Sequence, residues 1–216
     1  MSLLDAVTLF QNGQTKESLS ILESLPEAKR ELSDSQTMIA LCLAAERKFE
    51  RAQAIFRALT RREPNEPAHW SNLAATQSDL GDFDEAIDNY KAALQRGSDG
   101  FSLLRPLGEL LLRKNDVQGA LGCLIRALEL EPSSIDTRVF LADAFSQIGE
   151  HTEAIRLVSD WRDSIIDDVD LLLLVATINL RGRHSLEAHY ISIKLKSIAP
   201  SHSGTLELAS VIKAIK

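Results

Sequence analysis

The sequence predicts an all-α fold, a right-handed α-solenoid of about six helical hairpins followed by one further helix. The main observation is that small residues recur every 34 positions along the chain. One series comprises Ala6, Ala40, Ala74, Gly108, Ala142 and Ala176, and another, twelve residues further on, comprises Ser18, Ala52, Ala86, Ala120, Ala154 and Ala188. Small side chains at fixed places let two helices cross closely. The composition agrees, because only 5% of the residues are aromatic and only 10 are glycine.

The clearest hairpin lies between Pro67 and Gly100. One face of its first helix, at i, i+3, i+4 and i+7, holds Trp70, Leu73, Ala74 and Gln77, which is helical spacing. Gly81 can adopt the positive φ that ends this helix. A second helix is expected after it, with the acidic residues Asp82, Asp84 and Glu85 at its N-terminal end.

The segment W-S-N-L-A, followed by L-G-D-F-D-E-A-I-D-N-Y-K-A-A-L, resembles a tetratricopeptide repeat (TPR). The resemblance covers nearly the whole chain, and the closing proline of the TPR pattern recurs as Pro64, Pro132 and Pro200. It implies one solenoid domain across 1–216. The six expected repeats are 1–32, 33–66, 67–100, 101–134, 135–168 and 169–202, with a capping helix over 203–216.

Four positions depart from the TPR pattern: Asp5, Pro106, Trp161 and Asn179. Pro106 is expected inside a helix near its first turn, where proline is tolerated but can kink the helix or shift its start.

The last helix is expected to pack on the sixth repeat and cap the array. Alternatively, it opens a further repeat of a longer protein. The residues expected to make this contact are Leu206, Ala209, Val211, Ile212 and Ile215.

Charge and composition argue against several classes of partner. The formal net charge of −7 disfavours nucleic acid, which needs a basic surface. No apolar run is long enough for a membrane span, and the N-terminal residues lack a secretion signal. Cys42 and Cys123 lie far apart in apolar surroundings, which favours reduced core thiols and a cytoplasmic location.

No residue pattern indicates catalysis, so we expect no enzyme activity, cofactor or metal site. His184 and His189 flank a glutamate but are five residues apart, whereas the zinc-protease pattern places them four apart. The segment R-G-S-D-G lacks the lysine and the spacing of a phosphate-binding loop.

The TPR resemblance implies that the first helix of each repeat lines a concave groove. Carried over position by position, it gives Thr37, Met38, Leu41, Ser71, Asn72, Ala75, Arg105, Glu109, Phe140, Asp143 and Leu174 as candidate peptide-binding residues. The same groove positions also include Asp34, Ala45, Asp79, Ser102, Leu112, Arg113, Asp136, Val139, Gln147, Leu173, Thr177 and Arg181. Arg105 can receive a carboxylate or pair with Glu109 four residues along, and the pairing is slightly favoured. Only Asn72 matches the polar residues with which some TPR proteins hold chaperone tails or extended peptides.

The sequence therefore predicts a scaffold that binds a peptide or helix of a partner protein. The alternative is the N-terminal, substrate-recruiting region of a larger bacterial glycosyltransferase or sulfotransferase. The chain is expected to be a monomer or a weak homodimer. The dimer contact would use the apolar residues Leu3, Leu4, Val7 and Phe10 at the N-terminal end.

Overall fold

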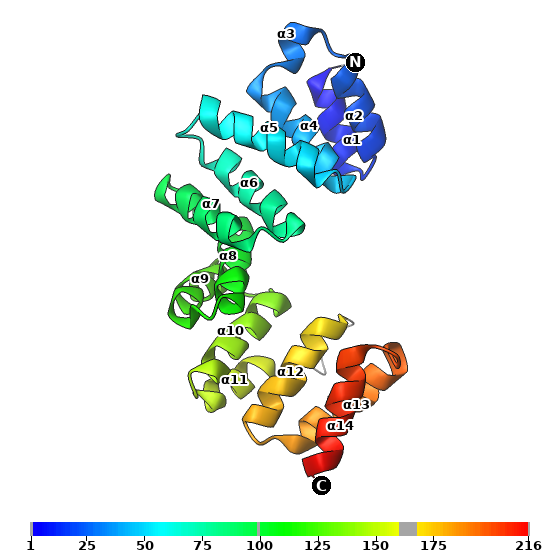
Figure 1. Cartoon of the computed structure of the whole chain (residues 1–216), viewed down its shortest axis with the longest axis vertical. Coiled ribbons are helices and arrows are strands. Elements are labelled where there is room, and N and C mark those ends of the chain that lie inside the picture. Colours follow the sequence, from blue (N-terminus) through cyan, green and yellow to red (C-terminus); the bar gives the residue numbers. More distant parts are fainter. Residues whose placement is uncertain (1, 99, 160–167, 216) are drawn as a thin grey trace. The chain divides into compact units, whose positions relative to one another are not determined.

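The computed structural model describes residues 2–98, 100–159 and 168–215. All regular structure in these ranges is helical, which confirms the all-α fold class (Figure 1). The chain divides into two compact units, Met1–Asp99 (unit 1) and Gly100–Lys216 (unit 2), which are described separately.

Unit 1 consists of helices packed in consecutive pairs, with one short helix between the first two pairs. Its helices are α1 (Leu3–Gln11), α2 (Thr15–Ser24), α3 (Glu27–Arg30), α4 (Ser33–Ala45), α5 (Phe49–Arg62), α6 (Pro67–Leu80) and α7 (Phe83–Gln95). The pairs in contact are α1 with α2, α4 with α5, and α6 with α7.

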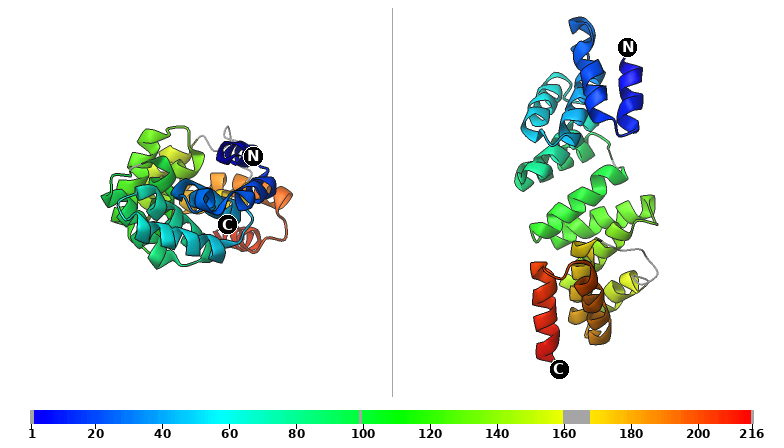
Figure 2. Two further views of the ribbon diagram at one scale, coloured as in Figure 1. Left: turned by 90° about the horizontal axis from the view of Figure 1, so that it is seen from above. Right: turned by 90° about the vertical axis from the view of Figure 1, so that its right-hand side faces the viewer.

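Unit 2 has the same organisation and ends in a single helix, drawn in red in Figure 2. Its helices are α8 (Phe101–Arg113), α9 (Val117–Leu130), α10 (Ile135–Gln147), α11 (His151–Val158), α12 (Val169–Arg181), α13 (Ser185–Ile198) and α14 (Ser203–Ile215). From α4 onward, the first helix of each pair begins 34 residues after the previous one, and α14 begins 34 residues after α12. The arrangement of all pairs as one domain across 1–216 stays a prediction.

The small positions lie where the two helices of a pair cross. Every alanine of both series is fully buried, with 0% of its surface exposed. At Gly108 the approach leaves no room for a side chain, because an added Cβ would lie 2.6 Å from Cγ of the buried Leu124 on the facing helix α9. The size of the residue at this position therefore controls how closely α8 and α9 pack.

Ser18 replaces alanine at the crossing of α1 and α2. Its buried hydroxyl donates a hydrogen bond to the backbone carbonyl of Ala6 at 2.7 Å. The Cys42 thiol, from α4, donates to the same hydroxyl at 3.3 Å. The polar atom is thus satisfied without solvent, which a buried hydroxyl requires.

A polar cluster joins α5 to the first turns of α4 and α6. Glu63, just after α5, accepts hydrogen bonds from Ser33 and from Nε2 of the buried His69, the latter at 3.0 Å. Arg62 donates to the Ser33 hydroxyl at 2.7 Å. The bonds from Ser33 and His69 hold the pKa of the Glu63 carboxyl below its ordinary value.

The Pro64 carbonyl connects the turn before α6 with α7. The Trp70 indole donates to it at 2.9 Å, and Nε of Arg96 donates at 2.6 Å. The Arg96 guanidinium also lies 4.2 Å from the centroid of the Trp70 ring, a cation–π arrangement. The tryptophan of the repeat pattern therefore fixes a turn as well as filling space.

Two of the irregular positions have local explanations, and a third leaves its helix continuous. Asp5 and Ser2 form a reciprocal capping box at the start of α1, so an acidic residue is favourable there. Pro106 lies within α8, which runs unbroken from Phe101 to Arg113. Asn179 is buried and donates its side-chain amide to the Val175 carbonyl at 2.8 Å. The fourth position, Trp161, lies outside the described residues.

The prediction of which residues of the C-terminal helix are buried is partly wrong. Leu208 and Ile212 of α14 are buried in the unit 2 core, whereas Leu206 and Val211 are 60% and 42% exposed. The apolar residues of α14 fit two different helical faces, and contact with α12 and α13 selects the face that contains Thr205, Leu208 and Ile212. The side chain of Ile215 lies outside the description.

Adding a methyl group at position 108 should destabilise the protein. We expect Gly108→Ala to lower the free energy of unfolding by about 1–3 kcal/mol in urea denaturation, because Leu124 cannot withdraw without disturbing the core. Gly122 of α9 is the matched control, since its added Cβ would meet nothing within 4 Å. Gly122→Ala should be neutral or stabilising, by up to about 1 kcal/mol. Equal stability of Gly108→Ala and the original chain would contradict the crossing model.

The Glu63 cluster predicts a pH-dependent contribution to stability. A carboxyl whose pKa is lowered on folding stabilises the native state above its unfolded-state pKa, and this contribution is lost as the pH falls through the native pKa. The stability difference between the original chain and Glu63→Gln should therefore be full at neutral pH and shrink at acidic pH. Urea denaturation across that range measures it, with the exposed Glu50→Gln as control. A difference that stays constant down to strongly acidic pH would show that the cluster has no such role.

Candidate functional site

The first helices α8, α10 and α12 of unit 2 line an open groove of about 550 Å³. We call it the unit 2 groove. Its lining residues are Arg105, Glu109 and Arg113 from α8, Asp136 and Phe140 from α10, and Asp168, Asp170, Leu171, Leu173, Leu174 and Thr177 from the start of α12 and α12 itself.

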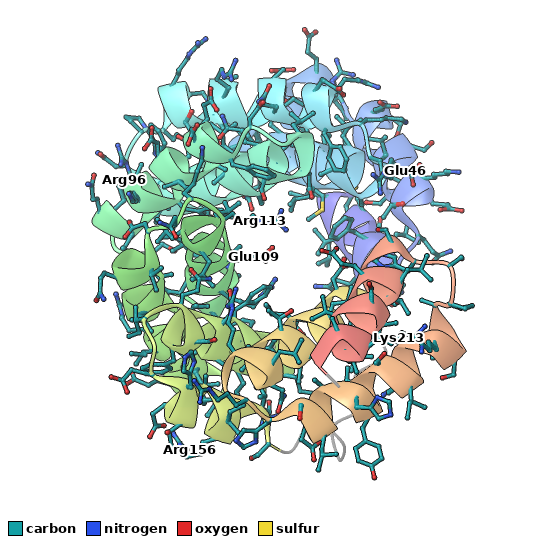
Figure 3. The ribbon with its side chains drawn as sticks, turned by 60° about the horizontal axis from the view of Figure 1, so that its bottom comes forward. Glu46, Arg96, Glu109, Arg113, Arg156 and Lys213 are labelled. Carbon is teal, nitrogen blue, oxygen red and sulfur yellow. The ribbon has the colours of Figure 1, made fainter. Side chains whose placement is uncertain are left out.

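The α8 side of the groove carries a row of charges one helical turn apart. Glu109 lies 3.8 Å from Arg105 and 3.1 Å from Arg113, measured between side-chain nitrogen and oxygen atoms. The predicted pairing of Arg105 with Glu109 is thus confirmed. Two guanidinium groups share one carboxylate, so this side keeps a net positive charge. Figure 3 shows Glu109 and Arg113 projecting toward the inner side of the unit 2 helices, whereas Arg156 of α11 projects outward.

The floor of the groove is apolar. Phe140 from α10 and Leu173 and Leu174 from α12 are half-buried, so each shows part of its side chain to the groove. The two leucines also pack against the unit 2 core. Because α10 and α12 are in contact, the floor is a continuous surface between neighbouring hairpins.

The N-terminal turns of α10 and α12 supply carboxylates. Asp136 lies in the first turn of α10, and Asp170 in the first turn of α12. Asp168 caps α12 by accepting a hydrogen bond from the Leu171 backbone amide at 2.9 Å. Acidic residues are favourable at helix N-termini. The same three carboxylates make this part of the groove lining negative.

Asp143 has mainly a structural role. It is 8% exposed and borders a smaller depression of about 180 Å³, together with Glu109 and Phe140. Its carboxylate accepts hydrogen bonds from Arg181 of α12 at 2.9 Å and from Gln147 at 2.7 Å. Asp143 therefore ties α10 to α12 beneath the groove.

The structure brings four of the eleven candidate residues into the unit 2 groove, with Asp143 beside them. These four are Arg105, Glu109, Phe140 and Leu174. The six others belong to unit 1, where Thr37, Met38 and Leu41 lie on α4 and Ser71, Asn72 and Ala75 lie on α6.

Three of the unit 1 candidates, Met38, Leu41 and Ser71, have side chains that are engaged within their own unit, whereas Ala75 is exposed. Met38 and Leu41 are half-buried and pack against the unit 1 core. The Ser71 hydroxyl donates to the Ala68 carbonyl at 3.0 Å. The Asn72 backbone carbonyl accepts from Thr76 at 2.9 Å, and Asn72 itself is half-buried.

Sequence reasoning did not single out Asp168, Asp170 and Leu171 as groove residues. Asp168 and Leu171 lie outside the positions that the TPR resemblance assigns to the groove, whereas Asp170 occupies the same repeat position as Asp136 and could have been found from it. The available signal was Asp168 immediately before a helix start, which is typical of an N-cap residue.

The described residues offer noncovalent recognition at this site. Among them, no three His, Cys, Asp or Glu side chains are grouped as metal ligands. Cys42 and Cys123 are thiols, and burial raises the pKa of the Cys42 thiol. No helix in the described ranges is long and apolar enough to cross a membrane.

Comparison with known proteins identifies the family. The family model described as "Tetratricopeptide repeat" matches residues 37–101 and 105–167. A search of curated proteins finds no significant match in sequence.

Several solved structures share the fold. YrrB, described as "a TPR protein with an unusual peptide-binding site", is 20% identical, with a TM-score of 0.70 over 85% of this chain and 95% of its own. PilF of Pseudomonas aeruginosa is 15% identical, with a TM-score of 0.79 over 96% of this chain and 95% of its own. A tetratricopeptide repeat protein of Parabacteroides merdae is also 15% identical, with a TM-score of 0.73 over 99% of this chain and 84% of its own. The chain belongs to the tetratricopeptide repeat family, and its α-solenoid scaffold is consistent with protein–protein interaction.

Proposed function

We propose that this chain is a scaffold that binds a peptide segment of a partner protein in the unit 2 groove. The observation that carries the proposal is the combination of an apolar floor with charged groups of both signs in one open groove. An apolar centre with a polar rim is the usual composition of a recognition surface.

The lining indicates the chemistry of the peptide. Phe140 and Leu174 can hold an apolar side chain, while the Arg105–Glu109–Arg113 row can receive a carboxylate through its guanidinium groups. Asp136 and Asp170 can hold a lysine, an arginine or an amino terminus. The expected ligand is therefore a segment with an apolar anchor, an acidic group and a basic group.

The likeness to YrrB supports the proposal at the level of the scaffold, because that protein is described as having a peptide-binding site. The comparisons lend no support to the alternative, a recruiting region of a larger transferase, which stays a prediction. A cytoplasmic location, the exclusion of nucleic acid and dimerisation through the N-terminal end also stay predictions.

The proposal is tested with peptides selected by phage display against the full chain and then measured by fluorescence anisotropy. We expect Phe140→Ala and Arg113→Glu each to weaken binding at least about tenfold, or about 1.4 kcal/mol, because one removes the apolar floor and the other reverses a charge.

Arg156→Glu is the matched control, since Arg156 is an exposed arginine of the same unit that projects from the opposite side. This variant should bind the selected peptides as the original chain does. Equal loss of affinity in Arg156→Glu, or unchanged affinity in both groove variants, would place the binding surface elsewhere.

A further inference from the structure

Helix α13 carries an apolar stripe on its solvent-facing side. Leu186, Tyr190 and Ile193 are 74%, 54% and 52% exposed. Their spacing of i, i+4 and i+7 places them on one side of the helix over two turns, a length of about 10 Å. Single exposed apolar residues are common, but three in a row on one helix form a patch that indicates a binding surface.

The 34-residue repeat provides an internal comparison for this α13 stripe. Four periods earlier, on α5, the same positions are Glu50, Ala54 and Arg57, and two periods earlier, on α9, they are Gln118, Gly122 and Ile125. All six residues are exposed.

The stripe is not the uncovered end of the array. Both α5 and α9 have a helical neighbour on each side within their own unit, α4 and α6 for α5, and α8 and α10 for α9. Their corresponding positions nevertheless face solvent. A further repeat after α14 would therefore leave the α13 stripe exposed as well.

The surroundings of the stripe are basic. Residues 183–198 contain three cations, Arg183, Lys194 and Lys196, and one carboxylate, Glu187, which gives a local net charge of 3 − 1 = +2. Helical spacing places Lys194 on one flank of the stripe and Lys196 on the other. This region contrasts with the chain as a whole, whose net charge is −7.

We propose that the α13 stripe is a second docking surface, and that its occupant is an acidic amphipathic helix of a partner protein. A helix with apolar residues at i, i+3 or i+4, and i+7 matches the length and spacing of the stripe. Acidic residues beside those anchors would meet Lys194 and Lys196. The surface is separate from the unit 2 groove, so this inference goes beyond the function proposed above.

The charges favour this occupant over two others. Pairing two copies through the stripe would bring Lys194 and Lys196 of both copies together, which is unfavourable. An anionic membrane would extend beyond the basic region, and the rest of unit 2 carries an excess of negative charge that would be unfavourable beside it. A single acidic helix contacts only the local positive surface.

The test uses the full chain and a fluorescent synthetic helix of about 18 residues with leucines on one face and glutamates on its flanks. The key variant combines Leu186→Glu, Tyr190→Ala and Ile193→Arg, which are the α5 residues at the same positions. The triple change leaves the net charge unaltered and should leave the urea denaturation curve nearly unchanged. We expect it to weaken peptide binding at least about tenfold in fluorescence anisotropy.

Two further measurements isolate the charge and the surface. Combined Lys194→Glu and Lys196→Glu should weaken binding of the glutamate peptide and strengthen binding of a lysine version. Phe140→Ala in the unit 2 groove should leave the affinity for both peptides unchanged. Failure of the groove proposal and failure of the α13 proposal can therefore be told apart.

Four outcomes would overturn the proposal. The first is absence of binding, and the second is equal affinity of the triple variant and the original chain. The third is sedimentation with vesicles of phosphatidylcholine and phosphatidylglycerol that the triple variant loses, which would assign the stripe to a membrane. The fourth is a concentration-dependent dimer that the triple variant loses, which would assign it to a second copy.

Discussion

The close crossing of the two helices in each hairpin is the constraint on which the structure depends. The distance between packed helices is set by the side chains at their contact, and here those side chains are alanine, glycine or serine. With the helices this near, the larger residues at neighbouring positions fill the space on either side of the crossing. The crossing also fixes the direction of the face of each first helix that is turned away from its partner helix. In unit 2, the groove floor is made of residues on α10 and α12 that this packing leaves half-buried.

Polar contacts add specificity to this apolar framework. Asp143 and Arg181 join α10 to α12 beneath the groove, and the Pro64 carbonyl joins Trp70 to Arg96 beside α6. Each contact links residues from different parts of the repeat, and the first satisfies the largely buried Asp143 carboxylate, which would be costly to bury alone. These polar contacts explain why some positions of the repeat hold polar residues although the helices around them remain well packed.

Periodicity in the sequence predicts the helices and the pairing of Arg105 with Glu109, because both depend on local spacing. It does not predict which face of α14 is buried, since that helix has apolar residues on two sides and its tertiary contacts decide between them. It overstated the accessibility of Asp143, whose carboxylate is engaged by an arginine 38 residues away. The α13 stripe lies at positions that the repeat pattern leaves variable, so it is revealed only by the exposure of these side chains in the folded structure.

The position of Glu109 between two arginines has a consequence for selectivity. An incoming carboxylate does not find bare guanidinium groups, because Glu109 already provides the countercharge. The ligand gains only the difference between its own contact and the one that it displaces or shares. Charge alone then gives little advantage to one acidic segment over another. For the ligand proposed above, discrimination would fall to shape, through the fit of an apolar side chain against Phe140 and Leu174, and promiscuous capture of anionic chains would be suppressed.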